Sequence, residues 1–458
     1  MNKVLGIFSL AMITAVSVDS IRNLPATALF GSSLIFFFVL GALFFLLPSA
    51  LVSAELASSR KNHAGVYGWV KDAFGQQAGF LAVWFQWIEN VIWYPTILSF
   101  VAGTIGYLIS PSLASNKIFL ISIILCSFWG VTLINLMGIK SSAWFSNFCA
   151  VGGLILPMAL IIALGAVWIF SGDPLQIHFT KTSMLPHMKD SHMWVALTGI
   201  ILSFCGMEIA TVHATNVKNP QRSYPRAMLI ATLIIVTTLV LGALSIAIVL
   251  PENKISLVAG IMQAFHAFFF AYHMHWVLPI VALMLVTGGM GSVNNWIIAP
   301  TRGLLFAAKD GNLPKHMQRE NLAGAPSTLL FYQAIIVSFI TMIFLLMPSV
   351  NASYWLLTAL AAQLYMFMYL LMFTSAIRLR YCGNTSGGFK IPGGQTFGMW
   401  IVAGAGIIGS LTTLAVGFIP PSNIRIGGEL HYEMLLIAGL LLMSLPPFLF
   451  YRFCYKSR

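Results

Sequence analysis

Long apolar segments alternate with short polar connections along the whole chain, and this pattern predicts the architecture. A membrane-spanning helix needs about 20 consecutive, mostly apolar residues, and stretches of that length recur from one end of the chain to the other. We therefore expect an all-α polytopic membrane protein with twelve transmembrane helices. The predicted spans lie at residues 4–30, 32–57, 80–108, 118–137, 144–170, 194–215, 227–250, 276–306, 328–347, 355–379, 397–418 and 434–451.

A polar interruption breaks the first apolar segment. Residues 17–25 read Ser-Val-Asp-Ser-Ile-Arg-Asn-Leu-Pro, so an acid, a base, an amide and a proline fall together inside a predicted span. A charge in hydrocarbon costs roughly 2.5–3.5 kcal/mol on insertion scales, so Asp19 and Arg22 should face a protein interior or a water-filled cavity. Because Pro25 lacks a backbone N–H and disfavours helix at Leu24, we expect the helix to break just before Pro25.

A second polar interruption lies in the other half of the chain. Residues 203–208 read Ser-Phe-Cys-Gly-Met-Glu inside an apolar run, where Gly206 adds backbone freedom and Glu208 a charge. Discontinuous helices early in each half are the best sequence indication of a transporter site between inverted repeats. We therefore expect helices 1–5 in residues 1–170, helices 6–10 in residues 171–381, and helices 11 and 12 in residues 382–458. Two merely kinked helices with a buried ion pair are the alternative.

Polar side chains on the third, eighth and tenth segments are expected to converge on these breaks. Glu89 is an intramembrane carboxylate and hence a functional candidate, although neighbouring helices could also satisfy it. Asn90 and Tyr94 are four residues apart and share a helix face. The predicted substrate-binding residues are Val18, Asp19, Ser20, Ile21, Arg22, Asn90, Cys205, Gly206, Glu208, Ser292, Trp296 and Tyr365. The candidates for gating or proton coupling are Glu89, Glu208, Tyr94 and Tyr369.

The spacing of Asp19 and Arg22 leaves two interpretations open. The two side chains, three residues apart, could form a structural ion pair that lowers the cost of burying either charge. Alternatively, a zwitterionic substrate could intervene, with its carboxylate at Arg22 and its ammonium group at Asp19. The first interpretation predicts loss of folding when one partner is removed, and the second predicts loss of binding.

Composition and charge support the membrane assignment. Hydrophobic residues make up 59% of the chain and charged residues 8%, and the mean hydropathy is +0.88, which is too apolar for a soluble domain. In a soluble protein, a net charge of +12 would suggest a nucleic-acid partner. In this chain, the positions of the lysines and arginines relative to the predicted spans indicate their role. Most lysines and arginines fall in alternate connections, and the positive-inside rule then puts both termini in the cytoplasm. We expect no nucleic-acid partner. The other loops hold only Lys117, Lys181, Lys189, Lys254 and Arg425.

Catalytic and metal-binding patterns are missing from the sequence. We find no nucleophile–base pair, metal-ligand cluster or phosphate loop, so we expect neither an enzyme nor a cofactor nor a metal site. The buried charges also fit a channel, but discontinuous helices early in both halves favour alternating access. A non-transporting amino-acid sensor is a further alternative. The five cysteines have no metal-ligand spacing and are expected to be small core residues.

Several motifs spread over nearly the whole chain carry a family resemblance. They are Leu47-Pro48 to Ala54-Glu55, Gly-Val-Tyr-Gly-Trp-Val at 65–70, Gly206-Met207-Glu208, Asn219-Pro220 with Tyr-Pro-Arg-Ala-Met at 224–228, Trp296-Ile297 to Arg302-Gly303, Ile-Pro-Gly-Gly at 391–394, and Pro-Pro-Ser-Asn-Ile at 420–424. Together they make the chain resemble the amino acid/polyamine/organocation transporter superfamily. Within it, the chain is most similar to the bacterial glutamate/γ-aminobutyrate antiporters.

The resemblance implies a fold and residue roles. It implies a LeuT-like core of 5+5 inverted repeats with discontinuous helices 1 and 6, plus two peripheral helices. In that superfamily the first helix commonly unwinds at a Gly-Ser-Gly stretch that binds the substrate carboxylate, and here Val18-Asp19-Ser20 takes its place. Glu208 matches an acidic residue of the sixth helix, and Trp296 a site-closing tryptophan. Asn90 matches a substrate-contacting asparagine of the arginine/agmatine antiporters, and Tyr365 and Tyr369 match tyrosines of the glutamate/γ-aminobutyrate group. Ser292 stands where that group carries a glutamate.

The resemblance also implies a function. We expect an amino acid/amine antiporter of the glutamate/γ-aminobutyrate type that works by alternating access in a bacterial inner membrane. A uniporter, or a proton-coupled symporter of neutral or basic amino acids, is the alternative. The expected partners are a small amino acid or amine, the lipid bilayer and, as further candidates, protons and a second copy of the chain.

Overall fold

Helices make up the regular structure of the computed structural model, which describes residues 6–59, 65–137, 148–149, 151–185, 191–209, 220–382, 388–394 and 396–455. None of these residues forms a β-strand. The helices up to residue 170 are α1 (Ile7–Val18), α2 (Leu24–Ala28), α3 (Leu34–Gly41), α4 (Leu47–Ser59), α5 (Gly65–Phe74), α6 (Gln76–Ile109), α7 (Lys117–Leu136) and α9 (Leu156–Phe170).

The rest of the chain contributes a second series of helices. They are α10 (Lys181–Met184), α11 (Ser191–Trp194), α12 (Ala196–Ser203), α13 (Pro220–Val249), α14 (Gly260–Ala271), α15 (Leu278–Ala307), α16 (Ser327–Thr341), α17 (Ile343–Leu346), α18 (Val350–Tyr381), α19 (Phe397–Val416), α20 (Glu429–Ser444) and α21 (Pro446–Tyr455). Short 3-10 or π turns connect or extend several of them: η1 (Ile21–Asn23), η3 (Ala42–Leu46), η5 (Val151–Ile155), η9 (Ala308–Asn312) and η10 (Lys315–Gln318).

The described helices agree with a polytopic membrane protein. Ten are long and apolar enough to cross a bilayer, and the bent pair Ile7–Val18 and Ile21–Ala28 makes up to eleven. These eleven match eleven of the predicted spans. Of the predicted sixth span, α11 and α12 are described, but residues 210–215 lie outside the described part of the chain. The arrangement into two inverted repeats stays a prediction.

The first helix breaks earlier than expected. Its first part, α1, ends at Val18, and Asp19 and Ser20 adopt extended backbone with ψ of 133° and 110°. Pro25 instead lies in the first turn of α2, where a missing N–H costs no hydrogen bond and the fixed φ suits the helix. The expectation of a break just before Pro25 is therefore wrong, because the proline starts the second part of the helix. The two parts meet at an angle of 40°.

A described helix ends where the sequence predicts the second break, at residues 203–208. The helix α12 ends at Ser203, and Gly206 has a φ of +112°. That value lies in the region that L side chains rarely adopt, so glycine is needed here. A Cβ at Gly206 would lie 3.5 Å from Val18 and 3.7 Å from Trp296, which places the second break beside the first.

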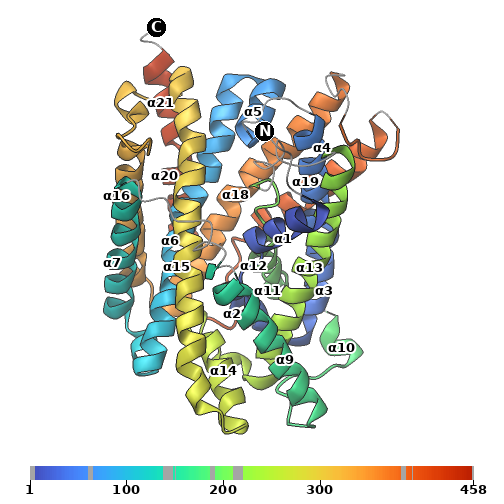
Figure 1. The fold of residues 1–458 in the computed structure, drawn as a ribbon, viewed down its shortest axis with the longest axis vertical. Coiled ribbons are helices and arrows are strands. Elements are labelled where there is room, and N and C mark those ends of the chain that lie inside the picture. The colour runs from blue at the N-terminus through green and yellow to red at the C-terminus, as the bar shows by residue number, and fades with distance from the viewer. Residues whose placement is uncertain are drawn as a thin grey trace.

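Two long helices form the centre of the bundle. Most side chains of α18 and α6 are buried inside the bundle, whereas most of those of α20 lie on its surface. The last helices are therefore peripheral. The helices α5 and α21 lie at one end of the molecule, and α10 and α14 at the other (Figure 1).

A buried ion pair lies near the end of the molecule that carries α5. Arg380 on α18 donates from Nη1 to both carboxylate oxygens of Glu55 on α4, at 2.5 Å for Oε1. Its Nη2 donates to the carbonyls of Ile391 and Gly394, both at 3.0 Å. The amide of Ile391 donates to Glu55 at 2.7 Å. We call Glu55, Arg380, Ile391 and Gly394 the clamp, since they join α4, α18 and the 391–394 turn.

Candidate functional site

A small cavity lies between the two helix breaks. Its volume is about 70 Å³, and its walls come from both breaks and from α6, α15 and α18. Of the predicted site residues, the structure places on its wall Val18, Asp19, Ser20, Arg22, Glu89, Asn90, Cys205, Ser292, Trp296 and Tyr365. The geometry brings these residues together, and their binding role stays a prediction.

Arg22 is the cation of this cavity. Its side chain is buried, and its Nη1 donates to the hydroxyls of Thr96 at 2.9 Å and Tyr354 at 3.2 Å. The guanidinium also lies over the ring of Trp93, 5.3 Å from the centroid. Its buried Nε has no hydrogen-bond partner. Arg22 is thus held by neutral groups, which leaves its charge available to an anion.

Asp19 lines the same cavity, but its carboxylate is turned away from Arg22. Its Oδ2 accepts a hydrogen bond from Thr238 of α13 at 2.7 Å, and its buried Oδ1 has no partner. Among the described residues, no ion pair joins Asp19 to Arg22, so the structure does not contain the structural pair considered above. Because successive side chains alternate along extended backbone, the extended break turns Asp19 toward α13 and Arg22 toward α6 and α18.

A smaller cavity continues from the first. It has a volume of about 30 Å³, and both cavities are lined by Asp19, Ser20, Arg22, Ile97 and Ser292. Ile21 lies on its wall, so this predicted residue contacts the second cavity. Gly153 and Gly288 also line it, and a Cβ on Gly153 would come within 2.1 Å of the Cα of Gly288. These glycines let η5 and α15 touch backbone to backbone beside the site.

Glu208 lies behind the cavity in a hydrogen-bonded network. It accepts from Tyr365 at 2.6 Å, from Tyr369 at 2.5 Å and from Gln86 at 3.3 Å. The hydroxyl of Tyr369 in turn accepts from the amide of Gly206 at 2.8 Å. The network therefore ties the second break to α18 and α6, and Tyr365 connects it to the cavity. A change in the protonation of Glu208 would alter all of these contacts.

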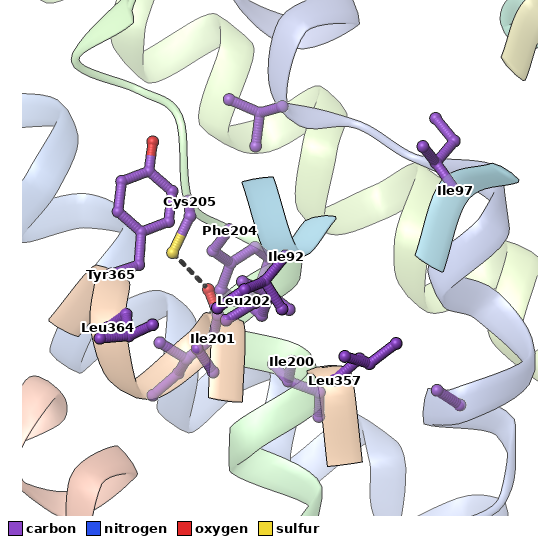
Figure 2. Close-up of a cluster of buried hydrophobic side chains, with 14 of the residues drawn as sticks. Ile92, Ile97, Ile200, Ile201, Leu202, Phe204, Cys205, Leu357, Leu364 and Tyr365 are labelled. Atoms are coloured by element: carbon purple, nitrogen blue, oxygen red, sulfur yellow. Dashed lines mark hydrogen bonds between the residues drawn. The ribbon is translucent and has the colours of Figure 1, made fainter. Parts of the chain in front are cut away.

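Cys205 and Tyr365 form one side of the cavity, and apolar side chains lie behind them (Figure 2). The thiol of Cys205 donates to the carbonyl of Ile201 at 3.3 Å, one helical turn earlier. The neighbouring Leu202 also lines the cavity. The wall on this side is therefore neutral, and a substrate would meet a thiol, a phenol ring and an aliphatic chain.

The remaining predicted residues lie on α6 and α15. Asn90 donates to the carboxylate of Glu89 at 3.1 Å and to the carbonyl of Gln86 at 2.9 Å. Tyr94 is fully buried and donates to the carbonyl of Trp296 at 3.0 Å, so it fixes α15 against α6 and does not face the cavity. Glu89 and Asn90 thus place a second carboxylate and an amide on the cavity wall.

The site offers charges of both signs to a small ligand. Asp19 and Glu89 lie on the same cavity wall as Arg22, and none of these carboxylates forms an ion pair with it among the described residues. A metal ion would need several clustered His, Cys, Asp or Glu side chains, and no such cluster occurs in the described part of the chain. A cavity of about 70 Å³ is below the 300–1,000 Å³ of ordinary ligand sites. Binding therefore requires movement of the lining groups.

Comparison with known proteins then decides the family. A family model described as amino acid permease matches residues 5–440. The chain belongs to the amino acid permease family. The sequence-based assignment to this transporter superfamily is thereby confirmed.

Individual relatives of this permease are transporters. It is 44% identical to an uncharacterized transporter of Legionella pneumophila, over 98% of its own length and 97% of the relative's. It is 30% identical to a glutamate/gamma-aminobutyrate antiporter of Lactococcus lactis, over 98% and 90% of the two chains. A probable agmatine/putrescine antiporter of the same species is 25% identical over 84% and 81%. The permease is a multi-pass membrane transporter and not an enzyme.

The sequence reasoning missed several groups around the site. Trp93 could have been found, because it lies four residues after Glu89 on the same helix face. Thr96 continues that face by one turn. Tyr354 and Thr238 hold the two charges from α18 and α13, but no sequence spacing connects them to the first break. Their roles depend on tertiary packing alone.

Proposed function

We propose that this permease exchanges an amino acid for a related amino acid or amine across the membrane by alternating access. The substrate lies in the cavity between the two helix breaks, with its carboxylate on Arg22 and its ammonium group on Asp19. The observation that carries the proposal is the separation of these two buried charges, each held by neutral groups and neither paired with the other. A zwitterion supplies both missing counter-charges at once.

Two further points support exchange over other modes of transport. Relatives at 30% and 25% identity are named as antiporters, and their substrates include both amino acids and amines. The lining groups come from the bent first helix and from the end of α12. If the second helix resumes after its break, this is the arrangement that transporters use for a site reached from each side in turn. The small cavity volume fits a state in which the lining groups have closed around the site.

Proton coupling is assigned to Glu208 with Glu89 as the second candidate. Glu208 is buried and contacts Tyr365 and Tyr369 of α18 and Gln86 of α6, so its charge is coupled to two helices. Loss or gain of its proton would shift the hydrogen bonds that hold the second break. Tyr369 is then the gating residue, because it joins Glu208 to the amide of Gly206.

The permease is assigned to a bacterial inner membrane with both termini in the cytoplasm. The distribution of Lys and Arg supports this orientation. A reporter enzyme fused after residue 458 tests it: activity confined to the cytoplasm supports the assignment, and periplasmic activity contradicts it.

Flux through proteoliposomes tests the exchange proposal. Labelled glutamate, γ-aminobutyrate, agmatine and neutral amino acids are offered outside, with and without unlabelled substrate inside, at two pH values. Antiport predicts uptake only with internal substrate, and equal uptake without it would indicate a channel or uniporter. Glu208→Gln should flatten the pH dependence of exchange. Unchanged pH profiles in both Glu208→Gln and Glu89→Gln would contradict the proton assignment.

A further inference from the structure

A second, larger cavity lies away from the candidate site. It is a groove of about 590 Å³ between α6, α15, α16, α17, α18, α20 and α21. Its rim includes exposed side chains such as Phe339 at 75% and Leu442 at 66%, while its floor includes Trp87 and Ile88, which are 3% and 2% exposed. We call it the lateral groove. Figure 1 shows α16, α20 and α21 grouped on the same side of the bundle as α6.

The chemistry of the lateral groove matches hydrocarbon. None of its lining side chains is charged, and most are leucine, isoleucine, methionine or aromatic. Its volume falls within the 300–1,000 Å³ range of ligand sites. The floor lies behind an exposed rim. A straight helix of a second copy, about 10–12 Å wide, would rest on this rim, whereas a flexible acyl chain can reach the floor.

Unpaired cations flank one end of the lateral groove. Met317 of η10 lines the groove, and the exposed Lys315 and Arg319 lie two residues to either side of it. Phe450 of α21 also lines it, and the exposed Arg452 follows two residues later. Both η10 and α21 contact η9, so these segments meet at one mouth.

The cations at this mouth are free to bind an anion. Among the described residues, none of Lys315, Arg319 and Arg452 has an ion-pair partner. The nearby Lys309 differs, because it pairs with Glu320 at 2.7 Å. Cations next to a membrane-facing apolar surface attract anionic lipid headgroups. The basic side chains at the mouth therefore favour lipids with anionic headgroups over neutral lipids that have the same acyl chains.

We propose that the lateral groove binds an anionic phospholipid, with an acyl chain against Trp87 and Ile88 and the headgroup at Lys315, Arg319 and Arg452. Hydrogen bonds hold the walls of this site: Trp87 donates to Gln333 of α16 at 2.9 Å, and Trp84 to the carbonyl of Met443 on α20 at 2.8 Å. Ile88 directly precedes Glu89 and Asn90, so the bound chain contacts the helix that carries these two lining residues of the substrate cavity.

Native mass spectrometry of the purified full-length chain tests the site. The protein is titrated with phosphatidylglycerol or with phosphatidylcholine of the same acyl chains, and the retained lipids are counted. Leu442→Trp fills the rim, and its matched control is Leu411→Trp on α19, which is 52% exposed and outside the groove. Lys315→Glu with Arg319→Glu reverses the headgroup charge. The exposed pair Lys181→Glu with Lys254→Glu is the charge-matched control.

The proposal predicts a distinct result for each variant. Wild-type protein should retain one phosphatidylglycerol more tightly than phosphatidylcholine. In the Lys315/Arg319 variant, the ratio of phosphatidylglycerol affinity to phosphatidylcholine affinity should fall by about tenfold or more. Each basic side chain near an anionic headgroup increases the affinity roughly fivefold. Leu442→Trp should weaken both lipids, and both controls should behave as wild type.

Two results would overturn the proposal. Equal lipid retention by Leu442→Trp and Leu411→Trp would show that the lipids bind all around the apolar surface of the protein and not specifically in the lateral groove. Conversion of a dimer to a monomer by Leu442→Trp, with lipid retention unchanged, would show that a second copy covers the groove.

Discussion

The clamp and the candidate site both contain buried charged groups, but the charges of the clamp form an ion pair with each other and those of the site do not. Glu55 and Arg380 are 1% and 4% exposed and contact each other directly, and backbone groups of Ile391 and Gly394 complete their hydrogen bonds. Asp19 and Arg22 are close in sequence yet face apart, and each keeps a buried polar atom without a partner.

This difference separates structural charge from charge kept for a ligand. A buried ion pair with satisfied hydrogen bonds contributes little net stability but is costly to split. A buried charge without a counter-ion costs free energy in the empty protein, and a ligand of opposite charge can recover that cost. The clamp therefore holds helices together, whereas Asp19 and Arg22 are better suited to binding. The following experiments are ordered by the size of the expected effect.

Splitting the clamp should have the largest effect. Glu55→Ala leaves Arg380 buried without a counter-ion, at a cost of about 3–5 kcal/mol, so we expect little folded protein in detergent. The double variant Glu55→Leu with Arg380→Met should recover part of the loss, because it removes both charges. Unfolding temperature and size-exclusion profiles measure this. Glu320→Ala removes the exposed pair with Lys309 and should cost no more than about 1 kcal/mol.

If Glu55→Ala and Glu320→Ala unfold at the same temperature, the clamp is not a structural ion pair. The difference between the two regions would then disappear.

Neutralising Arg22 should abolish binding without unfolding the protein. Arg22→Met keeps an apolar side chain of similar length and removes a buried charge that forms no direct ion pair among the described residues, so the unfolding temperature of the empty protein should be close to that of the wild type. Binding of amino acids should fall at least about a hundredfold, since a charge-assisted contact to a carboxylate contributes roughly 3 kcal/mol or more in a buried site. Decarboxylated amines should lose less.

Isothermal titration of an amino acid and its matching amine on folded Arg22→Met decides this prediction. Equal losses for both ligands, or a large drop in unfolding temperature, would assign Arg22 the same structural role as Arg380.

These two regions also show what the sequence could predict. Apolar segment lengths predicted eleven spans that the structure contains, because membrane helices satisfy their backbone internally and need a fixed length. The two polar interruptions, the polar positions on the third, eighth and tenth segments and the family resemblance together predicted most of the residues that line the cavity. The sequence could not predict the direction in which each side chain points. Whether Asp19 meets Arg22 depends on two extended residues, and the partner of Glu55 lies 325 positions away in Arg380.

Thiol modification should affect the site and spare the clamp. Cys205 lines the cavity, whereas Cys382 is exposed two residues after Arg380. A small membrane-permeant methanethiosulfonate should block most exchange in wild-type proteoliposomes, because the added group fills a cavity of about 70 Å³. Saturating substrate should slow the block, and Cys205→Ala should be resistant. Block of Cys205→Ala at the wild-type rate would place the sensitive thiol outside the cavity, and Cys382→Ala should behave as wild type.

Removing a single hydroxyl beside Arg22 should give the smallest effect. Tyr354 accepts a hydrogen bond from Arg22 Nη1 at 3.2 Å and donates to the Arg22 carbonyl at 3.3 Å, so it orients the guanidinium without supplying charge. Tyr354→Phe keeps the ring and loses about 1 kcal/mol of positioning, which corresponds to roughly fivefold weaker amino-acid binding. Thr96 still holds the guanidinium at 2.9 Å, so binding should not be abolished.

Tyr432→Phe is the matched control, because Tyr432 is equally buried but donates to the carbonyl of Gly417, far along the chain from either break. It should leave affinity unchanged while lowering stability by a similar amount. Equal affinities in Tyr354→Phe and wild type would mean that Thr96 and the ring of Trp93 suffice to orient Arg22. An affinity loss as large as that of Arg22→Met would mean that Tyr354 itself contacts the substrate.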